Sequence, residues 1–148
     1  MKDRFLNGCI AGSLSGLVAS LFDYLFVSYF KFGTIHLIDF AGVFIFGSRP
    51  QTLGEKIFAQ FGVLVFTALI GILFVHLILK ISSRYLLWKG LISGILLWFF
   101  VYALVELYKV PHFHRTSLAS SMENTIIAMI YGFVLSALLT WLQNRERI

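Results

Sequence analysis

Residues 5–30 read FLNGCIAGSLSGLVASLFDYLFVSYF, an apolar stretch in which Asp23 is the one charged residue. About 20 residues of helix cross the hydrocarbon core of a membrane, so this stretch is long enough to span it. Small residues recur at every fourth position along one side: Gly8, Gly12, Gly16 and Ser20. A second stripe, Ala11, Ser15 and Ala19, ends at Asp23. Such stripes let helices approach closely in a membrane, and a carboxylate at the end of one predicts contact with protein, water or a ligand.

The composition of the whole chain indicates a membrane protein. Of its 148 residues, 59% are hydrophobic and 13% are charged, whereas about 25% of the residues in soluble domains are charged. The net charge is +5, but the basic residues stand singly at the ends of apolar stretches, as interface anchors do. We therefore expect the lipid bilayer as the main partner and no nucleic acid.

Three further stretches resemble the first in length and hydropathy. The predicted spanning helices cover residues 5–30, 56–80, 86–108 and 122–142. A shorter apolar segment, 39–47, is too short to span and is expected to be interfacial or re-entrant, with Asp39 as its N-cap. The sequence therefore predicts an all-α fold: a polytopic integral membrane four-helix bundle, with one short segment after the first helix, forming a single domain over residues 1–148.

Two of these helices have a start signal in the sequence. A hydroxyl residue followed three positions later by glutamate is typical of a capping box, and this pattern occurs at Thr52 with Glu55 and at Ser120 with Glu123. An even number of spans places both termini on one side of the membrane. That side carries seven basic residues against five on the other, so the positive-inside rule favours cytoplasmic termini.

The stripes of small residues continue on two other predicted helices. Gly90 and Gly94 lie on the helix at 86–108, and Gly132 lies on the helix at 122–142. We expect the first, third and fourth helices to meet through these faces. The helix at 56–80 has fewer small residues and is expected to face lipid over much of its surface.

The uncommon polar residues are predicted to gather on one side of the membrane. Alternating helix directions place Asp23 and Glu106 in the same half, because a helix rises about 1.5 Å per residue. Buried carboxylates suit a proton or cation pathway. The structural alternatives are a capped Asp23 and a Glu106 that pairs with Lys109. The candidate pathway residues are Asp23, Gln60, Tyr102, Glu106 and Asn124.

The same side contains the residues of a possible metal site. His112 and His114 alternate in the third loop, and His36 and Asp39 lie in the first loop. Imidazole and carboxylate groups bind transition metals, although solvated loop histidines are the alternative. His76 falls on the opposite side.

The sequence contains no catalytic motif. It has no Walker sequence, nucleophile elbow, HExxH or cysteine pair. A quinone pocket built from Trp98, Phe99 and Tyr102 is conceivable. We nevertheless expect no cofactor and no enzymatic activity.

Three glycine-containing segments carry a resemblance to a known group. They are residues 11–20, residues 86–94 (LLWKGLISG) and residues 130–132 (IYG). In this organisation the chain resembles the YagU-like and YqhR-like small inner-membrane proteins of bacteria, an uncharacterised group. The resemblance implies a four-helix protein of the bacterial cytoplasmic membrane with a loose link to stress or acid resistance. The first loop of this chain is shorter than that of YagU-like members.

These observations favour a small transport or permeation protein. It would handle protons, cations or a small solute through a polar cavity open to the outer face. Four short helices enclose little volume, so a homo-oligomer is expected. The alternatives are an accessory or anchor subunit of a larger membrane complex and, third, a haem- or quinone-binding electron-transfer subunit.

Overall fold

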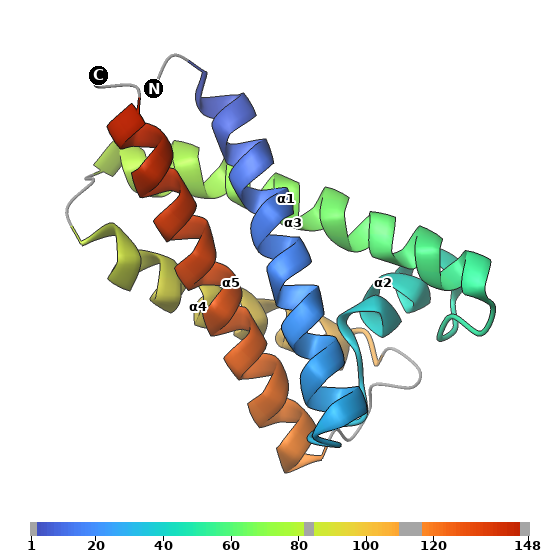
Figure 1. Cartoon of the computed structure of the whole chain (residues 1–148). Coiled ribbons are helices and arrows are strands. Elements are labelled where there is room, and N and C mark those ends of the chain that lie inside the picture. Colours follow the sequence, from blue (N-terminus) through green and yellow to red (C-terminus); the bar gives the residue numbers. More distant parts are fainter. Residues whose placement is uncertain (1–2, 82–84, 110–116, 146–148) are drawn as a thin grey trace.

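The computed structural model describes residues 3–81, 85–109 and 117–145, and all regular structure within these ranges is helical. The predicted all-α class is therefore confirmed. The elements, shown in Figure 1, are α1 (Arg4–Tyr24), a π-helical turn η1 (Leu25–Tyr29), α2 (Leu37–Phe46), α3 (Leu53–Ile81), α4 (Leu86–Leu107) and α5 (Leu118–Arg145).

Four helices within the described ranges are long and apolar enough to cross a membrane, which indicates a multi-pass membrane protein. Their spans are Arg4–Tyr29, Leu53–Leu77, Leu86–Leu107 and Leu118–Asn144. The predicted number of spans is confirmed, but two of the predicted starts are late. α3 begins at Leu53 rather than at residue 56, and α5 begins at Leu118 rather than at residue 122.

Side chains determine where α1 and α3 begin. Asp3 Oδ1 accepts the N–H of Leu6 at 2.9 Å, which satisfies one of the free donors in the first turn of α1. At α3, Thr52 Oγ1 accepts the N–H of Glu55 at 3.2 Å, and Glu55 Oε2 accepts the N–H of Thr52 at 3.1 Å. This reciprocal pair confirms the predicted capping box.

Two predicted caps are wrong. The hydroxyl of Ser117, not that of Ser120, caps α5, because Ser117 Oγ accepts the N–H of Ser120 at 3.2 Å. Glu123 is therefore carried into the second turn of the helix. In α2 the N-cap is His36, and Asp39 lies in the first turn, where its Oδ2 accepts the N–H of His36 at 2.9 Å.

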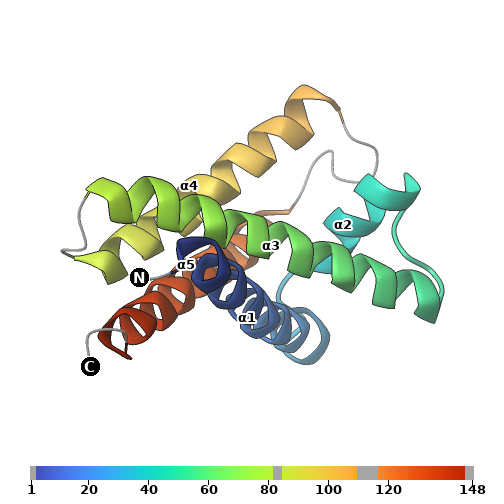
Figure 2. The ribbon, with the colours of Figure 1, turned by 90° about the horizontal axis from the view of Figure 1, so that it is seen from above.

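The helices form two closely packed pairs. α1 contacts α3, and α4 contacts α5, while α1 and α5 also meet and run in opposite directions (Figure 1). Viewed from above, α3 crosses over α1, and α2 lies beside the first half of α3 (Figure 2). The start of α1 and the end of α5 therefore lie at one end of the molecule, and α2 lies towards the other.

The glycine stripe of α1 packs against α3. A Cβ atom on Gly8 would lie 2.8 Å from Ile72 Cα, and one on Gly12 would lie 3.0 Å from Ala68 Cα. The prediction that the first, third and fourth spanning helices meet through their small faces is wrong for this stripe, whereas the contacts of α5 with α1 and α4 are as predicted. The helix that was expected to face lipid supplies the partner surface, because Ala68 and Gly71 lie at the crossing point.

The glycines of α4 pack against α5 as predicted. A Cβ atom on Gly90 would lie 2.6 Å from Ser136 Cβ, and one on Gly94 would lie 3.4 Å from Gly132 Cα. These two helices are therefore close enough to exclude larger side chains from the contact.

The second stripe of α1 faces α5. Ala11, Ser15 and Ala19 are at most 2% exposed, and the two alanines share a core with Ile127 and Leu135 of α5. Asp23 continues this stripe by one turn. Because the two helices run in opposite directions, Asp23 is directed at the first turns of α5.

Candidate functional site

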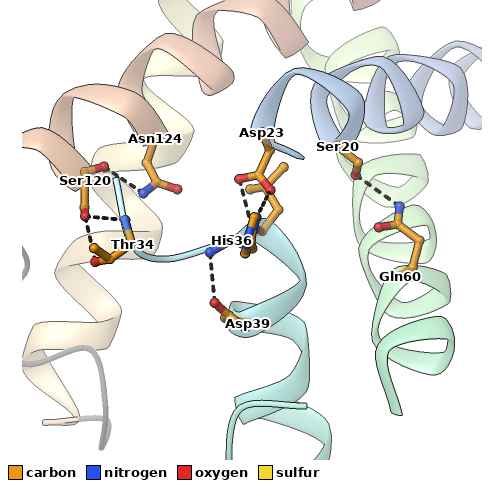
Figure 3. Close-up of polar contacts among 9 residues, drawn as sticks. Ser20, Asp23, Thr34, His36, Asp39, Gln60, Ser120 and Asn124 are labelled. Atoms are coloured by element: carbon orange, nitrogen blue, oxygen red, sulfur yellow. Dashed lines mark hydrogen bonds and ion pairs between the residues drawn. The ribbon is translucent and has the colours of Figure 1, made fainter. Parts of the chain in front are cut away.

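Asp23 is the centre of a polar cluster at the end of α1 (Figure 3). Asp23 as a whole is 3% exposed. Asp23 Oδ2 lies 2.9 Å from His36 Nδ1, and Oδ1 accepts the N–H of Leu37 at 3.1 Å. Leu37 is the first residue of α2, so the carboxylate also faces the positive end of a helix dipole.

His36 is the partly solvated end of this cluster, with 25% of its side chain exposed. Its ring stacks on Tyr24 with centroids 6.4 Å apart. The hydrogen bond to Asp23 raises the pKa of His36 above its ordinary value of 6.5. The negative charges of Asp23 and Asp39 act in the same direction, whereas burial and the charge of Lys56 oppose the shift in this pKa. The contact with Asp23 therefore favours the protonated form of the imidazole.

α5 adds a second buried carboxyl group, Glu123. The residue is 0% exposed, and neither carboxyl oxygen has a hydrogen-bond partner among the described residues. The charge of Glu123 interacts with that of Asp23. Its side chain also lies against Gly33, where an added Cβ atom would come within 3.2 Å of Glu123 Oε2. The candidate pathway residues do not include Glu123, for which the sequence predicts a capping-box role on the same side of the membrane as Asp23.

Asn124 follows Glu123 on α5 and is 2% exposed. Its Nδ2 donates to the backbone oxygen of Ser120 at 2.7 Å, while its Oδ1 has no hydrogen-bond partner in the described part of the chain. Figure 3 shows this oxygen pointing towards the side on which Asp23 lies. Ser120 Oγ also accepts the N–H of Thr34 at 3.1 Å, which ties the first loop to α5.

Gln60 joins the cluster to α3. Its Nε2 donates to Ser20 Oγ at 3.0 Å, one turn before Asp23 on α1 (Figure 3). Three of the candidate pathway residues therefore lie in the same part of the molecule, each on a different helix: Asp23 on α1, Gln60 on α3 and Asn124 on α5.

The other two candidate pathway residues lie in different surroundings. Glu106 is exposed near the end of α4, unlike the buried Asp23. Tyr102, together with Trp98 and Phe99, lines a cavity of about 400 Å³ between α4 and α5. The cavity has the size of a small-molecule pocket, but its mainly apolar walls would not hold an ion.

The predicted metal site is not assembled within the described ranges. His112 and His114 lie outside them, and the described residues contain no group of three or more His, Cys, Asp or Glu that could hold a metal ion. His36 and Asp39 are present in the polar cluster, where both bond to protein groups. His76 is exposed, and its Nδ1 lies 2.9 Å from the carbonyl oxygen of Ile72.

Comparison of the chain with protein-family models, with curated proteins and with solved structures finds no match. The resemblance to YagU-like and YqhR-like proteins stays a prediction. The chemistry of the polar cluster is therefore the feature of the molecule that bears on function.

Proposed function

We propose that the chain is a small transport or permeation protein of the bacterial cytoplasmic membrane. It handles protons, cations or a small polar solute at the cluster around Asp23, on the outer side of the membrane. The observation that carries this proposal is the 2.9 Å contact between Asp23 and His36, with the buried carboxyl group of Glu123 close to it.

The charges of the cluster support a role with cations. The cluster contains three buried acidic residues, Asp23, Asp39 and Glu123. The charges of the two aspartates act on the imidazole of His36, and Glu123 interacts with Asp23. The N-terminus of α2 and a protonated His36 compensate the two aspartates. No comparable group compensates Glu123 among the described residues. Because an unpaired buried carboxylate is costly in a membrane, the cluster favours the uptake of a positive charge.

The proposal includes the assembly of several protomers. The four spanning helices pack through glycines, so one chain encloses little space between them. A continuous pathway would form where the clusters of several copies meet. In this proposal the termini face the cytoplasm, and the chain has no enzymatic activity of its own.

A flux measurement tests the proposal. The purified protein is reconstituted into liposomes that contain a pH-sensitive dye, and a potassium diffusion potential drives proton entry. We expect flux above that of empty liposomes, and we expect Asp23→Asn to abolish it because the neutral amide no longer pairs with His36. Glu55→Gln, at the start of α3, is the matched control and should retain the flux.

Wild-type flux equal to that of empty liposomes, for protons and for sodium or potassium with the corresponding dyes, would contradict the proposal. Native mass spectrometry from a gentle detergent then distinguishes the alternatives. A stoichiometric partner would favour an accessory subunit. A bound ring compound would favour an electron-transfer subunit, for which the cavity beside Trp98 is the relevant observation.

A further inference from the structure

Glu123 combines complete burial with a lack of hydrogen-bond partners. At 0% exposure, neither of its carboxyl oxygens accepts a hydrogen bond from a donor group among the residues that the structure describes, and its neighbour Asp23 is a second carboxyl group. We infer that Glu123 binds an exchangeable proton and that the Asp23–His36 pair connects it to water. This inference rests on the proposed transport function and names its ion and the residue that holds it.

The unpartnered side-chain atoms on this part of α5 are all hydrogen-bond acceptors. They are both carboxyl oxygens of Glu123 and the carboxamide oxygen of Asn124. Acceptors that face no donor require an added proton or cation, because buried polar groups without partners are strongly unfavourable. The charge of Asp23, which interacts with Glu123, increases this requirement.

A proton fits these atoms better than a metal ion does. Hard cations such as Ca²⁺ and Mg²⁺ take about six or more oxygen ligands. Here Glu123 and Asn124 supply three free oxygens, and adjacent residues of a helix point about 100° apart. The oxygens of Asp23 are already bonded to His36 and Leu37. A proton needs one oxygen.

Exposure decreases in order along the proposed route. The side chain of His36 is 25% exposed, that of Asp23 is 4% exposed, and Glu123 is fully buried. The ionisable groups that act on His36 come from three elements: Asp23 from α1, Asp39 from α2 and Lys56 from α3. Glu123 interacts with the same Asp23 from α5. Asp23 is therefore the group that the imidazole and the second carboxyl group share.

The proton transfers balance at each step. A hydronium ion gives a proton to His36 Nε2 and leaves as water, while His36 gives its Nδ1 proton to Asp23 Oδ2, so the imidazole stays neutral. The Asp23 carboxylic acid then passes this proton to the Glu123 carboxylate and becomes ionised again. Histidine and buried carboxyl groups form such relays because each can both accept and release a proton.

Infrared spectroscopy of the full-length protein in liposomes tests the inference. We expect a carboxylic-acid C=O band at neutral pH that is lost in Glu123→Gln and shifted in Glu123→Asp. The control Glu55→Gln should keep the band. His36→Gln should keep the band and slow the proton flux, because the acid remains while its connection to water is weakened. A band unchanged in Glu123→Gln would overturn the inference.

Two further outcomes separate the inference from the proposed function. Wild-type protein that shows the band but no flux would contradict transport and leave the proton on Glu123 supported. Wild-type flux that is retained in Glu123→Gln would overturn the role of Glu123 while the transport function stands. Loss of the band on addition of sodium at constant pH would make sodium the ligand and would also overturn the inference.

Discussion

At the scale of single residues, His36 couples the cluster to pH. Its hydrogen bond to Asp23 raises the pKa of the imidazole above 6.5. A raised pKa in the folded state means that the pair stabilises the fold fully below pH 6.5 and loses this contribution as pH rises through the raised value. Because the imidazole is mostly covered, the hydrogen bond to the charged partner contributes about 2 kcal/mol.

We therefore predict a pH-dependent effect of His36→Gln on stability. Thermal unfolding in detergent should show the variant less stable than the wild type below pH 6.5, with a difference that shrinks as pH rises. His76→Gln is the matched control, because that histidine is exposed and its ring lies against a carbonyl oxygen of its own helix. Parallel pH profiles for wild type and His36→Gln would show that the pair does not couple protonation to folding.

The sequence places Asp23 and Glu123 on the same side of the membrane, but it predicts only Asp23 as a pathway residue. Asp23 stands out because it is the one charged residue in a long apolar stretch. Glu123 follows Ser120 at capping-box spacing, so its sequence context indicates an exposed helix start. The structure differs because Ser117 takes the capping role and extends α5 by one turn. A local pattern with two candidate serines does not reveal which of them begins the helix.

At the scale of helices, close packing depends on a few positions without side chains. A Cβ atom on Gly12 would lie 3.0 Å from Ala68 Cα and 3.1 Å from Gly71 Cα, both on α3. Backbone atoms of a helix cannot move aside as a flexible side chain can. The two helices would have to separate.

We predict that Gly12→Ala destabilises the protein by about 1–3 kcal/mol, the usual cost of overpacking a tight contact. Gly54→Ala is the matched control, because a Cβ atom there would meet nothing within 4 Å. That variant should be unchanged or slightly more stable, since alanine favours helix. Unfolding by SDS in mixed micelles, followed by circular dichroism, measures both. Equal stability of the two variants would contradict a tight α1–α3 contact.

Helix number is predictable from this sequence, whereas helix partners are predictable only in part: the contact of α4 with α5 is expected, and that of α1 with α3 is not. Length and hydropathy predict four spans because each must cross the same thickness of lipid. A stripe of small residues shows that a helix has a face that permits close approach, but the partner needs small residues only at the crossing point. Ala68 and Gly71 suffice for this on α3, although that helix has no long stripe.

At the scale of the whole molecule, the polar cluster and the chain ends lie at opposite ends. Asp23 lies in the last turn of α1, and α5 begins beside that end of α1. The start of α1 and the end of α5 lie together at the other end of the molecule (Figure 1). If the termini are cytoplasmic, His36 meets the outer aqueous phase. Under the proposed transport function, the direction of a proton or cation gradient would then determine whether the cluster receives or releases the ion.

Cysteine labelling tests this orientation. Cys9 is the one cysteine of the chain, so Cys9→Ser provides a background for single cysteines at two exposed positions. Ser48→Cys lies in the link that follows α2, and Asn144→Cys lies at the end of α5. In intact cells, a membrane-impermeant maleimide should label Ser48→Cys, and it should label Asn144→Cys only after permeabilisation, because the positive-inside rule favours cytoplasmic termini. The reverse pattern would place His36 on the cytoplasmic side. Labelling of both positions from outside would contradict the three membrane crossings that the four spans place between Ser48 and Asn144.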